Sequence, residues 1–502
     1  MSRHSIPFAL TLVLLLTACA PSEPPVTTKI DVVELPSPES PLVPIRLMFT
    51  VGSIHDPAGK EGLAALTAMM IGEAGTENRS YSELLDALYP MASEISVDTD
   101  RETTVISGVA HRETLDDYTN LLVEAVLQPA FDESDFSRNK EQLLSYLTTT
   151  LRATNDELLG LEALQQVVFE GHPYEHSPAG TVEGLESITL DDVRAFYGEN
   201  YTQANLMLGV AGGYPADFVA SLTSRLSTLP EGEDTGLMVL PDPTPISGRE
   251  FTLIDKETDS VGIHFGYALP LTRADADYYP LMVANSYLGE HRTFHGRLMK
   301  QLRGERGLNY GDYSYIEYWH LPPFTSNPSP NYPRRDQYFS VWVRPVVPDT
   351  AHFALRDAIY EVDRLIARGL TQEEFELTRD FVTNYSKLWA RTLENRLAFL
   401  MDSEFYRMPY YIDEIDSRLA AMTVDDVNAA VRKYLQTDNF QAVLVTNNAA
   451  EVQAYLAAGD PSPMHYNTEP DPQVVEDDKV IEVLEVNPAG FEIIPVEEMF
   501  QR

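Results

Sequence analysis

Cysteine is nearly absent from this chain of 502 residues, in which Cys19 is the only one. A single cysteine excludes an intrachain disulfide, and its place near the N-terminus argues against thiol catalysis. Basic residues are also scarce, with 36 Lys and Arg against 77 Asp and Glu and a net charge of −41. A chain this acidic lacks the basic surface that nucleic-acid binding requires, and we interpret its charge as a well-solvated surface.

The chain also lacks a membrane-spanning run at its N-terminus. The apolar stretch 6–16 is too short to cross a bilayer and has the length of a signal-peptide core. Arg3 and His4 precede this stretch, as basic residues do in such signals. We therefore predict that residues 1–18 form a signal peptide and do not belong to the fold.

The residues around the cysteine indicate lipid attachment. Leu16-Thr17-Ala18-Cys19 resembles the processing site of a bacterial lipoprotein, which would make Cys19 the lipidated N-terminus. Residues 19–28 are then a short tether. Ala20, in place of an aspartate, favours sorting to the outer membrane, facing the periplasm. A plain secretory signal with a chance cysteine is the alternative.

The remaining chain divides into two units of about 200 residues, 29–229 and 249–458, which is an ordinary domain size. Between them, 230–248 is rich in Pro, Gly, Glu and Asp and is predicted to be a linker. Residues 459–502 form an acidic, proline-containing tail that we expect to be ordered only in part. Two short segments of this tail are candidate edge strands, 480–484 and 491–495.

Short patterns recur in both units. The segment 189–193, TLDDV, is typical of a cap before a helix and is repeated as TVDDV at 423–427. The acidic start of a long helix at 132–136 recurs at 371–375. Two such anchors at similar offsets indicate a duplicated domain. In the first unit we expect strands at 45–51, 94–97, 103–109 and 205–213 and helices at 62–76, 115–127 and 132–151.

The segment 62–76, GLAALTAMMIGEAGT, is apolar on nearly every side, which predicts a helix inside the protein. A strand-like run and a glycine-containing turn precede it. This order resembles the pitrilysin/insulinase family of zinc metallopeptidases, the inverzincins that include processing peptidases, in which such a helix carries the motif H-x-x-E-H. The resemblance covers roughly residues 28–460, a length that suits two domains.

On this chain the family's motif falls on Ala65, Ala68 and Met69, which are i, i+3 and i+4 and share one helix face. The family's third zinc ligand, a glutamate, falls on Tyr146. Zinc needs nitrogen, oxygen or thiolate donors, which alanine lacks and a thioether supplies poorly. The resemblance therefore implies a member without the zinc motif, so that no cofactor is bound by this chain.

The same resemblance implies an α+β fold of two homologous α/β sandwich halves, each a sheet with helices packed on one face. In the second half, 296–315 resembles the family's signature for substrate binding, with its Arg and Tyr at Arg303 and Tyr310. A guanidinium can grip a carboxylate or peptide carbonyls, and a phenol can donate to an oxyanion. Apart from the resemblance, a surface charge and a half-buried packing residue would explain the pair.

Two histidine groups are further candidates. The segment from His172 to His176 reads H-x-x-E-H, but a proline lies inside it and Gly and Pro flank it, so we expect a structural loop. Glu290, His291 and His295 form the second group, whose histidines have a metal-ligand spacing if they are helical. For this second group a metal site, polar residues that face substrate, and an ordinary helix start are the alternatives.

A lost zinc motif beside a kept Arg–Tyr pair favours a non-catalytic, substrate-binding subunit of a heterodimeric zinc endopeptidase. Such an enzyme would act on peptides or unfolded proteins in the periplasm, and the expected partner is a homologous chain that carries the zinc. One alternative is a scaffold or peptide-binding protein without a peptidase partner. Another is a metalloendopeptidase with relocated ligands, which the segment 172–176 would supply. Whether the chain takes part in catalysis stays open at this point.

Overall fold

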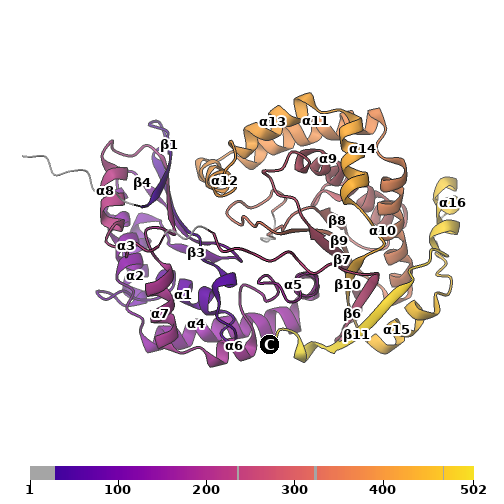
Figure 1. The fold of residues 1–502 in the computed structure, drawn as a ribbon, viewed down its shortest axis with the longest axis horizontal. Coiled ribbons are helices and arrows are strands. Elements are labelled where there is room, and N and C mark those ends of the chain that lie inside the picture. The colour runs from indigo at the N-terminus through magenta and orange to yellow at the C-terminus, as the bar shows by residue number, and fades with distance from the viewer. Residues whose placement is uncertain (1–28, 234–236, 321–324, 467–468) are drawn as a thin grey trace, which may run out of the picture.

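The computed structural model describes residues 29–233, 237–320, 325–466 and 469–502. The predicted signal peptide, the tether and Cys19 lie outside the described residues. Two mixed β-sheets and their helices form two halves that lie side by side (Figure 1). This arrangement confirms the predicted α+β class. Within the described ranges, no helix has both the length and the hydrophobicity needed to cross a bilayer.

The first half is built on a five-stranded sheet with the order β1-β5-β2-β4-β3. β1 runs parallel to β5, and the other neighbours are antiparallel. The predicted strands are confirmed to within a few residues, and β1 is an addition to them. The bounds are β1 (Asp31–Pro36), β2 (Leu42–Phe49), β3 (Ser96–Thr99), β4 (Thr104–His111) and β5 (Leu206–Gly212).

The helices of the first half follow the predicted pattern, except that one of them changes from an α-helix to a π-helix along its length. The helix at 132–151 is α4, which continues into a π-helix (Tyr146–Thr154). The helix at 62–76 ends early, at Gly72, because Gly75 and Thr76 pair instead with residues 129 and 130. The bounds are α1 (Leu63–Gly72), α2 (Tyr81–Leu88), α3 (Leu115–Leu127), α4 (Glu133–Ser145), α5 (Asp156–Val168), α6 (Val182–Ser187), α7 (Leu190–Asn200) and α8 (Phe218–Leu226).

The second half is built on a six-stranded sheet with the order β11-β6-β10-β7-β9-β8. Its strands are β6 (Arg249–Asp255), β7 (Val261–Leu269), β8 (Asp312–Tyr315), β9 (Gln337–Val346), β10 (Phe440–Thr446) and β11 (Pro488–Pro495). Its helices are α9 (Tyr278–Gly289), a π-helix (Met299–Glu305), α10 (Pro348–Arg368), α11 (Gln372–Trp389), α12 (Leu393–Phe405), α13 (Tyr411–Ala421), α14 (Val424–Tyr434), α15 (Ala449–Ala458) and α16 (Pro472–Ile481).

The two halves repeat one topology. The strand order β6-β10-β7-β9-β8 matches β1-β5-β2-β4-β3, and in both the first pair is parallel. Thr189 and Thr423 cap the equivalent helices α7 and α14 by accepting a hydrogen bond from the amides of Asp192 and Asp426. Each aspartate accepts in return from its threonine amide, which completes a capping box. The predicted duplication is confirmed.

Each half also contributes one helix that packs on the sheet of the other half. α5 of the first half packs on β7 and β10, and α12 of the second half packs on β1, β2 and β5. The contacts are close, because a Cβ on Gly160 of α5 would lie 2.4 Å from the His264 ring, and one on Gly209 would lie 2.3 Å from the Met401 sulfur. Each sheet therefore carries its own helices on one face and a helix from the other half on the second.

The tail is more ordered than predicted. β11 adds a parallel strand beside β6, which confirms the candidate strand at 491–495. The candidate strand at 480–484 is wrong, because α16 extends to Ile481 and a turn follows. Arg356 holds the start of the tail by donating to the carbonyl oxygens of Gly459 and Asp460. Most of the described tail is thus part of the second half.

The last residues return to the first half. Beyond β11, the carbonyl oxygen of Phe500 accepts a hydrogen bond from the amide of Val182 at 2.9 Å. The carbonyl oxygen of Met499 accepts one from Nε of Arg152 at 2.7 Å. Figure 1 shows the C-terminus beside α6. The tail therefore fastens the two halves together.

Candidate functional site

One face of α1 opens onto a cavity of about 350 Å³ between the halves. Ala65, Ala68 and Met69 line it, followed one turn later by Glu73. These positions share a face because residues three and four apart meet on a helix. Tyr146, at the start of the π-helix, lines the same cavity. We call this space the α1 cavity, and it brings together all four positions at which the resemblance places zinc ligands and a general base.

The side chains at these positions do not fit a zinc ion. They supply two methyl groups, a thioether and a phenol, where a catalytic site needs deprotonated nitrogen, oxygen or thiolate donors. Burial and the nearby charge of Glu162 raise the pKa of Tyr146, so its phenol stays protonated. Nowhere in the described part of the chain do three or more His, Asp or Glu side chains form a group that could hold a metal ion.

The second half closes the α1 cavity from the opposite side. Tyr318, His320 and Tyr332 reach into the lining from the chain between β8 and β9. The His320 ring stacks on Tyr332 with centroids 4.2 Å apart. The Arg334 guanidinium lies 3.3 Å from the centre of the Tyr318 ring. These stacked side chains form an aromatic wall on the side of the cavity that belongs to the second half.

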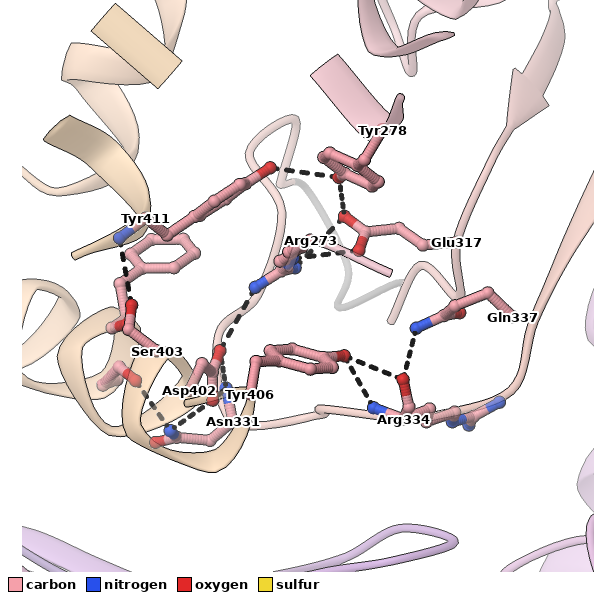
Figure 2. Close-up of polar contacts among 12 residues, drawn as sticks. Arg273, Tyr278, Glu317, Asn331, Arg334, Gln337, Asp402, Ser403, Tyr406 and Tyr411 are labelled. Carbon is pink, nitrogen blue, oxygen red and sulfur yellow. Dashed lines mark hydrogen bonds and ion pairs between the residues drawn. The ribbon is translucent and has the colours of Figure 1, made fainter. Parts of the chain in front are cut away.

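A buried polar network holds this wall against α12 and α13 (Figure 2). Arg273 forms a bidentate ion pair with Glu317, with N–O distances of 2.9 and 3.1 Å. The Asp402 carboxylate accepts from the backbone amide of Asn331 at 3.0 Å. Asn331 itself is buried, although several prolines in the preceding segment would suit an exposed loop. The network fixes the path of the backbone that leads to Arg334.

Two arginines next to this wall bind carboxylates of the first half. Arg334 donates to Asp100 from Nε at 2.7 Å and from Nη2 at 2.6 Å. Arg335 donates from Nε to Glu102 at 2.6 Å. Glu102 also accepts a hydrogen bond from the Tyr174 hydroxyl. Sequence reasoning missed these pairs, because Asp100 and Glu102 lie in an ordinary turn and their partners lie more than two hundred residues away.

The segment from His172 to His176 is a loop, as predicted from its proline and glycines. The two histidines point to different partners. Nε2 of His172 lies 2.9 Å from the carbonyl oxygen of Pro241, and Nε2 of His176 lies 3.1 Å from Oδ2 of Asp56. Asp56 in turn accepts the amides of residues 62 and 64 at the start of α1. This loop therefore supports the start of α1.

The second histidine group is not helical, since α9 ends at Gly289 and turns follow. Burial raises the pKa of Glu290 to about 7, helped by Glu317 and opposed by a hydrogen bond from Ser286. His291 is buried, with Nδ1 2.7 Å from the Tyr315 hydroxyl. Burial lowers the pKa of His291 to about 3, so it is neutral. His295 is exposed and lines a different pocket. A shared metal site has no support from this arrangement.

The predicted substrate-binding pair lies outside the lining of the α1 cavity. The Arg303 guanidinium sits 4.7 Å from the centre of the Tyr310 ring and 5.1 Å from that of Phe294. Tyr310 is 70% exposed and Phe294 is 67% exposed. Arg303 is thus held between two exposed aromatic rings. Phe294 was not predicted, because its approach to Arg303 depends on the turns after α9.

Comparison with known proteins agrees with this fold. Residues 32–181 match the model of the insulinase family (peptidase family M16), and residues 187–381 match that of the peptidase M16 inactive domain. The non-peptidase homolog YmxG of Helicobacter pylori is 22% identical over 405 residues, which is 80% of this chain and 88% of that protein. The mitochondrial-processing peptidase subunit beta of Caenorhabditis elegans is 20% identical over 53% of this chain and 58% of its own length.

Solved structures share the fold. A peptidase M16 inactive domain from Pseudomonas fluorescens superposes with a TM-score of 0.73 at 21% identity, covering 84% of this chain and 97% of that one. A protease from Helicobacter pylori gives a TM-score of 0.72 at 15% identity with the same coverage. At these identities the likeness concerns the fold alone. The two matched family models, which together span more than half of the chain, show that it belongs to the M16 (insulinase) peptidase family.

Proposed function

We propose that this chain is the non-catalytic, substrate-binding subunit of a heterodimeric M16 zinc endopeptidase that acts on peptides or unfolded proteins in the periplasm. One observation carries the proposal: the positions at which the resemblance places the metal ligands line the α1 cavity without supplying a zinc donor set, while Arg303 stays in contact with the exposed ring of Tyr310. A homologous chain that carries zinc would supply the metal and the general base. Tyr310 would then act on a substrate held in the partner's site.

The names of the relatives support an assembly of two chains. They include alpha and beta subunits of the mitochondrial-processing peptidase. They also include subunit 1 of the cytochrome b-c1 complex of Caenorhabditis elegans, 20% identical over 283 residues, which keeps a scaffold without a peptidase partner as the second candidate. A peptidase with relocated ligands has less support, because the nitrogens of His172 and His176 face separate protein oxygens.

The purified chain alone is expected to hold no stoichiometric zinc and to cleave no peptide, because Ala65, Ala68, Met69 and Tyr146 supply no zinc donors and the described carboxylates form no metal-binding group. Elemental analysis and a quenched fluorescent peptide measure both properties. A matched positive control combines Ala65→His, Ala68→Glu, Met69→His and Tyr146→Glu, which rebuilds the donor set on the same cavity and should acquire zinc. One zinc per wild-type chain, lost in His172→Ala, would instead support the relocated site.

For localisation we propose an outer-membrane lipoprotein that faces the periplasm, anchored through Cys19. Cys19→Ser is expected to move the protein from the membrane fraction to the soluble periplasmic fraction with its fold unchanged. A single acyl chain anchors only marginally, so stable attachment depends on the several chains that this residue would carry. Fractionation and circular dichroism test this prediction, and a Ser variant that still sediments with outer membranes would contradict it.

A further inference from the structure

Carboxylates gather around the α1 cavity without basic partners in its lining. Glu73, Asp98, Asp100 and Glu162 line it, and no Lys or Arg among the described residues does. The charge of Asp100 is neutralised by its ion pair with Arg334, which is not part of the lining. The other three carboxylates form no ion pair with any described residue. The cavity therefore carries an excess of negative charge at the place where the family would hold a metal cation.

Glu162 is the most informative of these residues. Its side chain projects from α5 into the lining, the residue is only 9% exposed, and Oε2 is buried. Within the described part of the chain, its carboxylate makes no hydrogen bond. Arg101 is near enough for the two charges to influence each other, but they form no ion pair. A buried carboxylate without a bonded partner is costly, and a cation placed beside it would offset that cost.

Glu73 shows the same lack of a partner where the cavity meets the end of α1. Its carboxylate accepts no hydrogen bond from a described residue. Burial raises the pKa of Glu73, with Arg138 lowering it and the charge of Asp98 raising it. Asp98 accepts one hydrogen bond, from the Tyr332 hydroxyl at 3.3 Å. The charges of Glu73 and Asp98 therefore repel each other, and a cation bound near both would reduce this repulsion.

The rest of the lining is apolar or aromatic. α1 presents methyl groups and a thioether, and Leu143, Leu158 and Leu161 add aliphatic surface. The rings of Tyr318 and Tyr332 complete the lining, with Arg334 and His320 already packed against them. An alkyl stem would be buried against the aliphatic side, while its charged head met the carboxylates. The volume of about 350 Å³ is in the range of small-ligand sites.

We propose that the α1 cavity binds a cationic group on an apolar stem, namely an alkylammonium or guanidinium. The source of that group is a lysine or arginine side chain of a bound peptide or a free alkylamine. An anion would meet uncompensated carboxylates there. A metal ion would lack the clustered ligands it requires, since the described residues form no such group. This inference concerns the isolated chain and does not depend on a partner subunit.

The experiment titrates the purified chain by calorimetry at low ionic strength. The ligands are a blocked tripeptide with a central lysine, the same peptide with norleucine, and putrescine. The lysine peptide should bind at least about tenfold more tightly than the norleucine peptide, the usual scale for a hydrogen bond to a charged group. Tighter binding of the peptide than of putrescine would assign the site to peptides, and the reverse order would assign it to free amines.

Glu162→Gln keeps the shape of the side chain and should abolish the preference for lysine over norleucine. The matched control is Glu141→Gln, on the exposed side of α4, which should preserve it. Glu73→Gln gives a second variant that should weaken the preference if Glu162→Gln does not fold, as judged by its melting curve. Equal binding of the two peptides, no binding of any amine, or tighter binding of calcium or zinc than of the amines would overturn the proposal.

Discussion

Arg334→Ala is expected to lower the free energy of unfolding by about 3 to 5 kcal/mol, the usual cost of removing one partner of a buried ion pair. Both side chains are almost completely buried, at 1% exposure for Arg334 and 3% for Asp100. Arg334 also donates from Nη1 to Oε1 of Gln165 at 2.7 Å. The substitution leaves a carboxylate of the first half without a partner, at the contact that joins the halves.

The loss should depend on pH. Burial alone would raise the pKa of Asp100, but the Arg334 charge and its hydrogen bonds outweigh burial and hold that pKa below 3.8. A lowered pKa contributes stability above about pH 4 that disappears as the pH falls through the folded-state value. Without Arg334 the buried carboxylate takes up a proton more readily. The difference between variant and wild type should therefore be larger at pH 7 than at pH 4.

Guanidinium unfolding at both pH values measures this effect. The matched control is Arg194→Ala, which breaks an exposed pair with Asp191 and should cost less than about 1 kcal/mol. The double variant with Asp100→Ala should lose less than the sum of the two single variants, because no orphaned charge remains. A loss for Arg334→Ala no greater than that for Arg194→Ala would show that this contact does not hold the halves together.

Tyr310→Phe is expected to lower the turnover of the heterodimer by about 10²-fold or more, the cost of deleting one oxyanion donor. This prediction depends on the proposed function. The change removes one hydroxyl and keeps the ring, so the contact with Arg303 should survive. Because Tyr310 is so exposed, the loss of its hydroxyl should leave the stability of the chain unchanged.

The measurement uses the co-purified pair of chains and a quenched fluorescent peptide, with gel filtration to establish that the complex is intact. Tyr89→Phe, at an exposed tyrosine of the first half, is the control and should keep full turnover. If turnover of the Tyr310 variant stays normal while the complex is intact, the hydroxyl takes no part in the chemistry. The scaffold function would then be the better explanation.

Much of the fold was open to prediction because its signals are local. The caps at Thr189 and Thr423 depend on residues three positions apart, and their recurrence in the sequence is enough to indicate the duplication. The order of the tail was underestimated, because an acidic composition does not show whether its carbonyl and carboxylate groups bind arginines from other parts of the chain. Arg356 and Arg306, which hold the tail, come from distant parts of the second half.

The sequence by itself determined which side chains stand at the positions where the resemblance predicts zinc ligands. Ala65, Ala68 and Met69 share a face through helix geometry alone, whatever the helix packs against. Only the tertiary structure decided what surrounds that face. Glu162 and Arg334 have unremarkable sequence neighbours, and their roles appear only when α5 crosses to the second sheet and the chain before β9 meets Asp100. Charges separated so far along a chain become neighbours through packing, and no local pattern carries that information.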